Sequence, residues 1–323
     1  NRASDLSALL DSMGQGIQTI KAANEGIESI TEFVQQAKSV ANQARDEANK
    51  VASSSGMYDS TKIEAATKFQ LSVTYNGETK SVEVTAPKAA ATGVEMAAKI
   101  QEELEKLTFG TPATALGGDV FEVTYEDDAF KMTSANGEEA KISFEVGGAK
   151  MDATAGNANR VKAISQFNDI LDQIDQLAKD SGYKGVNLLG GTDQSLTVIF
   201  NEDRSSNLTI QGVDASTKGL DISRVTNWGS NTNIDASIEE VEDAINELRN
   251  MASEFGNNYS IVQNREDFTE NLINVLEEGS DKLVLADMNE ESANMLALQT
   301  RQQLGVNSLS LASQAAQAVL KLF

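Results

Sequence analysis

Most residue types that carry enzyme chemistry are missing from this sequence, and only carboxylates are abundant. The 323 residues include 49 Asp and Glu against 26 Lys and Arg, with no histidine and no cysteine. Ser-His-Asp and Cys-His catalysis therefore require residues that the chain does not have, and no imidazole or thiolate is present to bind zinc, copper or haem. Two carboxylates held at a fixed separation in different environments would still support general acid–base chemistry.

The neighbouring carboxylates do not form such a pair. They occur in three groups, Glu126-Asp127-Asp128, Glu239-Glu240 and Glu277-Glu278. We interpret all three as solvated surface charge, because adjacent acids on loops and helix ends rarely have the different environments that acid–base catalysis needs. The ligand spacing of an EF-hand is absent, and the glycine pairs are not followed by Lys-Ser or Lys-Thr as in a phosphate-binding loop. We expect no enzyme activity, no catalytic or metal-binding residue and no cofactor.

The charge is distributed unevenly along the chain. The net charge of −23 argues against nucleic acid as a partner, and no run of about 18 apolar residues predicts insertion into a membrane. Residues 292–323 contain no Asp or Glu and only two basic residues, so this segment carries +2 and the rest carries −25. Such an apolar segment is typical of either a buried core helix or a helix that binds a partner.

Helical periodicity dominates both ends of the chain. Apolar residues recur in steps of three and four over residues 3–52, and this spacing predicts a helix of roughly 75 Å at 1.5 Å per residue. The same spacing returns over 158–182 and 238–275, and we expect Gly279 to interrupt it before a final helix from about Leu283. Helices of this length need partners, so we predict a mainly α fold with a long antiparallel, coiled-coil-like bundle.

The middle of the chain predicts strands. Residues 68–147 alternate between apolar and polar types, with a two-residue hairpin at Asn76-Gly77 and a helix over 93–107. Three further strands follow, and Asn136-Gly137 is expected to link the last two. This order predicts an inserted α+β (ββαβββ) domain at 53–157. A separate hairpin is predicted near 195–211, within a helical rod domain formed by 1–52 and 158–282.

Several passages of the sequence resemble the bacterial flagellins. They are 286–292 (ADMNEES), 299–305 (QTRQQLG), 319–323 (VLKLF), 263–265 (QNR), and 171–175 (LDQID) with 185–189 (GVNLL). The resemblance covers roughly 1–52 and 158–323, and 283–323 corresponds to the assembly helix of the family. The insert resembles a small repeat motif of flagellins and hook-associated proteins, although the commonest flagellins carry their variable domains after the hairpin.

This resemblance implies a structural subunit that polymerises through its terminal helices into the flagellar filament for swimming motility. It also implies secretion to the extracellular filament, with other flagellin subunits, an export chaperone and hook-associated or cap proteins as partners. We expect the apolar residues of the C-terminal helix to make the subunit contacts: Leu296, Leu304, Val306, Leu309, Leu311, Ala315, Ala318, Val319, Leu320, Leu322 and Phe323. Burial in the core of the same chain is the alternative for this helix.

Three further expectations accompany the resemblance. Because the sequence opens on Asn1, we expect that the N-terminal export and assembly segment of the family is missing. In flagellins sensed by the animal Toll-like receptor, a helix carries an Arg-Glu pair and a second glutamate lies nearby. Lys38, Ser39 and Gln166 stand at these positions, which predicts weak or no activation. Two other functions remain open: a hook–filament junction protein, and a surface module that binds polysaccharide through the insert.

Overall fold

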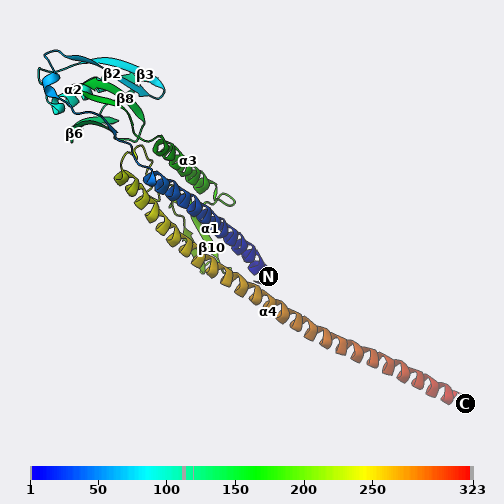
Figure 1. The fold of residues 1–323 in the computed structure, drawn as a ribbon. Helices are drawn as coiled ribbons and strands as arrows, with labels where there is room; N and C mark the ends of the chain where they lie inside the picture. Colours follow the sequence, from blue (N-terminus) through cyan, green and yellow to red (C-terminus); the bar gives the residue numbers. More distant parts are fainter. Residues whose placement is uncertain (1, 111–113, 119, 321–323) are drawn as a thin grey trace. The chain divides into compact units, whose positions relative to one another are not determined.

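In the computed structural model of the chain, residues 2–110, 114–118 and 120–320 are described, and they belong to two compact units. The first unit comprises Asn1–Ile17, Thr197–Thr209 and Ser260–Phe323, and the second comprises Gln18–Leu196 and Ile210–Tyr259. Long helices and antiparallel sheets form the chain, as the sequence predicts at this level (Figure 1). The long helices are α1 (Arg2–Asp46), α3 (Ala158–Asp180) and α4 (Asn231–Leu320).

The helices of the second unit run side by side (Figure 1). Lys38 of α1 pairs with Glu242 of α4 at 2.8 Å, and Arg45 pairs with Asp235 at 2.6 Å, so these two helices are antiparallel. Their apolar stripes are buried between them, because residues three and four apart lie on one helix face. The fully buried side chains include Ile20, Ile27, Ile30, Val34, Phe167, Leu171, Ile174, Val241, Leu248 and Phe255.

Two helix boundaries differ from the prediction. The first helix ends at Asp46 instead of continuing to about residue 52, because the following backbone pairs with the insert. Lys50 and Gly156, for example, form an isolated antiparallel bridge. The prediction that Gly279 interrupts the last helix is wrong, since α4 is continuous from Asn231 to Leu320. A glycine costs roughly 1 kcal/mol in a helix interior, which a helix of this length tolerates.

A glycine- and asparagine-rich passage before α4 is anchored by the single tryptophan. Trp228 is fully buried, and its ring meets that of Phe167 edge-on with 5.1 Å between centroids. The indole Nε1 donates a hydrogen bond to Ser237 Oγ at 3.0 Å. The polar tip of the indole is therefore satisfied inside the core, as a buried tryptophan requires.

Arg160 joins the segments from which the insert leaves the helices. Its side chain is buried, and its Nε donates to the carbonyl oxygen of Glu47 at 2.8 Å. The guanidinium also donates to the carbonyl oxygens of Trp228 and Gly229, both at 3.1 Å, and to Asn231 Oδ1 at 2.6 Å. Burial lowers the pKa of Arg160. One side chain thus satisfies backbone carbonyls at the end of α1 and before α4.

The insert contains two sheets that approach each other through β1. One sheet has the order β3-β2-β8-β9 and the other β1-β7-β6, while a bridge between Ser55 and Lys150 connects the β1 segment to β9. The helix α2 contacts β3, β6 and β7, so it covers the side where the two outer strands are left. The strands are β1 (Ala52–Ser53), β2 (Lys68–Tyr75), β3 (Glu78–Thr85), β4 (Thr108–Phe109), β5 (Thr114–Ala115), β6 (Phe121–Glu126), β7 (Ala129–Ser134), β8 (Ala140–Val146) and β9 (Ala149–Ala155), with η1 (Ser60–Lys62) and α2 (Gly93–Glu105).

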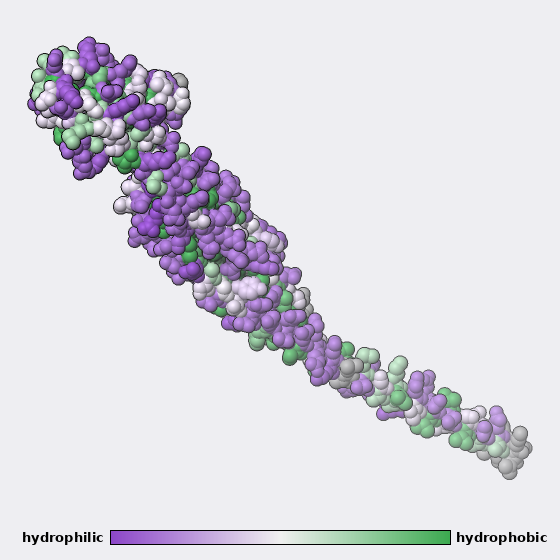
Figure 2. Space-filling model, viewed as in Figure 1, coloured by the Kyte–Doolittle hydropathy of each residue, from purple (hydrophilic) through white to green (hydrophobic). Residues whose placement is uncertain are grey.

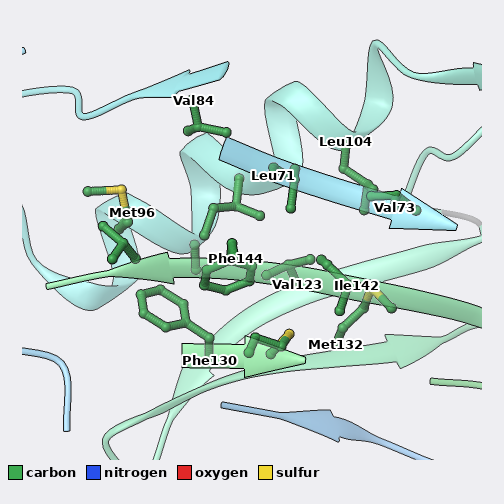
Figure 3. Close-up of a cluster of buried hydrophobic side chains, with 14 of the residues drawn as sticks. Leu71, Val73, Val84, Met96, Leu104, Val123, Phe130, Met132, Ile142 and Phe144 are labelled. Carbon is green, nitrogen blue, oxygen red and sulfur yellow. The ribbon is translucent and has the colours of Figure 1, made fainter. Parts of the chain in front are cut away.

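The insert has its own core, drawn in Figure 3. Leu71 and Phe144 of one sheet face Phe130 and Met132 of the other, and Leu104 of α2 completes the cluster. The rings of Phe130 and Phe144 meet nearly perpendicular at 5.5 Å. All described aromatic rings of the insert are buried or half-buried, so they serve packing and leave no exposed platform for stacking on a sugar.

The predicted ββαβββ order is incomplete. Asn76-Gly77 does form the tight turn between β2 and β3, with both residues at positive φ. However, four long strands follow α2, because β9 was missed, and Asn136-Gly137 connects two strands of different sheets instead of a hairpin. The turn between β6 and β7 is made by Asp127 and Asp128, both at positive φ. Aspartate tolerates this conformation better than most side chains.

Candidate assembly surface

The stretch of α4 in the first unit begins with a buried face. Val262, Thr269 and Ile273 are buried there. The guanidinium of Arg265 lies over the ring of Phe200, 5.2 Å from its centroid. Phe200 follows the first strand of the predicted hairpin, which consists of β10 (Ser195–Ile199) and β11 (Asn207–Gln211). The hairpin therefore contacts α4 through a cation–π interaction.

Beyond this stretch α4 has no buried side chain in the described part of the chain. From Glu277 to Ala318 every described side chain is exposed. Five of the predicted assembly residues are large apolar side chains with high exposed fractions: Leu296 66%, Leu304 60%, Val306 65%, Leu309 76% and Leu311 67%. Ala315 and Ala318 are exposed as well. The side chains of Val319 and Leu320, and the residues Leu322 and Phe323, lie outside the described part.

The apolar residues of this segment form two stripes along the helix. An α-helix turns by about 100° per residue, which places Leu296, Leu304, Leu311, Ala315 and Ala318 within one arc of about 100°. A second stripe lies roughly 170° away by the same helical geometry. It consists of Met288, Met295, Leu298, Val306 and Leu309. Figure 2 shows apolar residues along this part of the helix.

Three members of the second stripe, Met288, Met295 and Leu298, were missed in the sequence-based set of assembly residues, although they are 61–67% exposed. Their spacing from Val306 and Leu309 was a usable signal. We did not recognise it because an apolar residue on the far side of a helix reads as a scattered surface residue until the buried face is known. Apart from Arg301, the polar residues between the stripes after Glu291 are uncharged.

The carboxylate groups considered above have ordinary structural partners. Glu240 accepts a hydrogen bond from the backbone of Ser223 at 2.8 Å, and Glu278 pairs with Lys282 at 2.8 Å. A hydrogen bond from Lys131 lowers the pKa of Asp127. Among the described residues, no three Asp or Glu side chains are grouped as metal ligands would be. Within the same residues, no helix has a stretch that is long and apolar enough to span a membrane.

The residues at the receptor-related positions lie on two helices of the second unit. Lys38 and Ser39 are on α1, where Lys38 is engaged in the ion pair with Glu242 and Ser39 is exposed. Gln166 is exposed on α3.

Comparison with known proteins gives a consistent family. Residues 238–323 match the family model described as the bacterial flagellin C-terminal helical region. The chain is 31% identical to a flagellin of Brucella melitensis over 180 residues, covering 52% of this chain and 64% of that protein. It is 29% identical to flagellin FljK of Caulobacter vibrioides over 175 residues, covering 54% and 64%.

A shorter match is closer. Flagellin C of Rhizobium meliloti is 43% identical over 86 residues, 27% of each chain. The chain thus spans less than two thirds of the length of the first two relatives. The segment with two exposed apolar stripes lies inside the family match. The chain is therefore a relative of the bacterial flagellins, and its residues 238–323 belong to their C-terminal helical region.

Proposed function

We propose that the chain is a structural subunit of the bacterial flagellar filament and that it assembles through residues 283–323. The observation that carries this proposal is the exposure of every described side chain from Glu277 to Ala318, in a segment rich in leucine. Exposed apolar surface of this extent is typical of interaction sites. The relatives are flagellins, and polymerisation with copies of the same chain supplies the partners.

The two-stripe geometry favours many neighbours over a single one. A partner helix covers one face, so stripes roughly 170° apart require at least two contacts. Contacts that repeat without closing into a ring generate an open helical polymer. The small side chains of Ala315 and Ala318 permit close approach of neighbouring helices. This arrangement fits a segment surrounded by identical helices.

Charge and burial support the same conclusion. Burying one large apolar side chain contributes about 1.5–3 kcal/mol, so ten such residues provide enough for non-covalent assembly. Residues 292–323 carry no carboxylate, while the rest of the chain carries −25. Contacts made through this segment therefore avoid the repulsion that acidic surfaces would produce at close range. We further propose an extracellular location and transient binding to an export chaperone and to hook-associated or cap proteins.

The test is polymerisation of the full-length protein, followed by electron microscopy after a cycle of heating and cooling. We expect long filaments from the natural sequence and none from a Leu304→Arg, Leu311→Arg variant, because each arginine places a charge in an apolar contact. The matched control is Met57→Arg, since Met57 is 74% exposed in the insert, outside the proposed surface. Filaments from the double variant, or only short rings from the natural sequence, would contradict the proposal.

We also propose that the chain activates the animal Toll-like receptor weakly or not at all. Lys38, Ser39 and Gln166 stand where the resemblance places an Arg-Glu pair and a second glutamate, and Lys38 is already paired with Glu242. A reporter-cell assay tests this. Full-strength signalling by the natural sequence would overturn it, and a Lys38→Arg, Ser39→Glu, Gln166→Glu variant should signal more strongly.

A further inference from the structure

The insert carries a surface groove between α2 and β6 that the proposed function does not use. Its helix side is a single face, since the lining residues on α2 are three, four, seven and eleven positions from the first. Its strand side is the outward face of β6. The lining includes Val94, Ala98, Gln101, Glu105, Glu122 and Thr124.

The strand in this groove is the edge of its sheet, and its free backbone groups can be identified. Ala135 N donates to Val120 O at 2.8 Å, so these two residues form a hydrogen-bonded pair of the antiparallel ladder. Such pairs alternate with non-hydrogen-bonded pairs. The backbone N–H and C=O of Phe121, Val123 and Tyr125 therefore point away from β7, toward α2.

Gln101 already uses two of these groups. Its Nε2 donates to the carbonyl oxygen of Phe121 at 3.1 Å, and its Oε1 accepts from Val123 N at 2.9 Å. The side-chain amide thus occupies the place that a peptide group of a further strand would take. The next outward groups are the carbonyl of Val123 and the amide of Tyr125, and the described part of the chain includes no hydrogen bond to either.

The groove beyond Gln101 is apolar at its base and acidic at its rim. Ala98 is small and exposed, and Val94 is 65% exposed. Glu105 and Glu122 have no Lys or Arg in an ion pair among the described residues, while Glu126 shares Lys131 with Asp127. Unpaired carboxylates on both walls favour a cationic occupant. A second copy of this chain, with a net charge of −23, is a poor match.

We propose that this groove binds an extended, basic segment of another protein, which adds to β6 as a strand beyond Gln101. The segment hydrogen-bonds to Val123 O and Tyr125 N, places a small apolar side chain over Ala98, and directs Lys or Arg toward Glu105 and Glu122. Backbone pairing supplies affinity in strand addition, and alternate side chains supply specificity. This binding does not depend on filament assembly.

The test uses the unassembled full chain and a fluorescein-labelled peptide of six residues in which Lys and Val alternate, measured by fluorescence anisotropy. We expect saturable binding, and none to a peptide in which Glu replaces Lys. Methylation of the peptide nitrogens at alternate residues should weaken binding at least about tenfold, because it removes the donors to β6. Ala98→Leu, which fills the groove, should weaken it by a similar factor, and Glu122→Gln by a smaller one.

The matched control is Glu102→Gln. Glu102 is also on α2, but it pairs with Lys99 and Lys106 outside the groove, so its replacement should leave the peptide affinity unchanged. Absence of saturable binding at millimolar peptide would overturn the proposal and leave Gln101 as a device that protects the edge of β6 from aggregation. Equal binding of the methylated peptide would overturn it as well, since charge alone would then explain the affinity. If Ala98→Leu fails to fold, the methylated peptide and Glu122→Gln decide.

Discussion

Two stretches of α4 have similar apolar spacing and opposite environments. Between Asn231 and Tyr259 the apolar face is buried in the second unit, where Val241, Leu248 and Phe255 have exposed fractions of 0–1%. Between Glu277 and Ala318 residues of the same types are exposed. An apolar stripe shows that a helix face needs burial, but it does not identify the partner. The partner is the same chain in the first stretch and, in our proposal, other subunits in the second.

The largest expected effect comes from removing one leucine from each stretch. Leu248→Ala should lower the free energy of unfolding of the unassembled chain by about 2–5 kcal/mol, because it leaves a cavity in a packed core. Leu311→Ala should change that free energy by less than about 0.5 kcal/mol, since its side chain is 67% exposed. Urea denaturation followed by circular dichroism measures both. Equal losses would show that the second stretch is packed within the chain itself.

A smaller effect tests whether α4 is continuous. No atom lies within 4 Å of a Cβ placed on Gly279, and its φ is not in the left-handed region. Gly279→Ala should therefore increase helix content and stabilise the helix by about 0.5–1 kcal/mol. The control is Gly77→Ala, which also has open space but a φ of +80°, and it should lose about 1–2 kcal/mol. Destabilisation by Gly279→Ala would indicate a break at this position.

The ion pair between Lys38 and Glu242 should contribute less than the apolar packing beside it. Both side chains are at least one-third exposed. Lys38→Gln is expected to cost about 0.2–1 kcal/mol at low salt. The difference from the natural sequence should shrink as sodium chloride is raised to about 1 M, because salt screens exposed charges. A loss that is independent of salt would point to packing instead of charge.

The smallest expected effect concerns Glu266 on the first-unit part of α4. Burial raises its pKa, and Asp267 and Glu270 raise it further. A carboxyl whose pKa is higher in the folded state opposes folding when ionised, so stability falls as the pH rises through its folded-state pKa. Glu266→Gln should therefore melt at a higher temperature than the natural sequence at neutral pH. The difference should narrow as the pH falls below the unfolded-state pKa of about 4.3. A lower melting temperature of the variant at neutral pH would contradict this.

The periodic elements of the fold were predictable because their signals are local. The stripe of α1 and the turn at Asn76-Gly77 depend on residues within a few positions of each other. The strand β9 was missed because its sequence, AKMDATA, has several alanines, which are depleted in strands. It forms beside β8, which supplies its hydrogen-bond partners. Asn136-Gly137 was misassigned since a turn sequence does not specify whether the next strand joins the same sheet.

The candidate surfaces show the same division. Most residues of the exposed stripes on α4 were identified from spacing and from the missing carboxylates. By contrast, no local pattern indicated that Arg160 binds three backbone carbonyls far apart in the sequence, or that the side chain of Gln101 occupies the edge of β6. These contacts depend on how distant segments meet.

By itself, the sequence determined the long helices, their apolar faces and the absence of histidine and cysteine chemistry. It also indicated the uncharged C-terminal segment and its resemblance to flagellins. Only the tertiary structure decided which apolar faces are buried within the chain, where α1 ends, that α4 continues through Gly279, and how the insert is paired. The physical reason is that periodicity reports the local geometry of a helix or strand, while burial and strand pairing depend on segments that are distant along the chain.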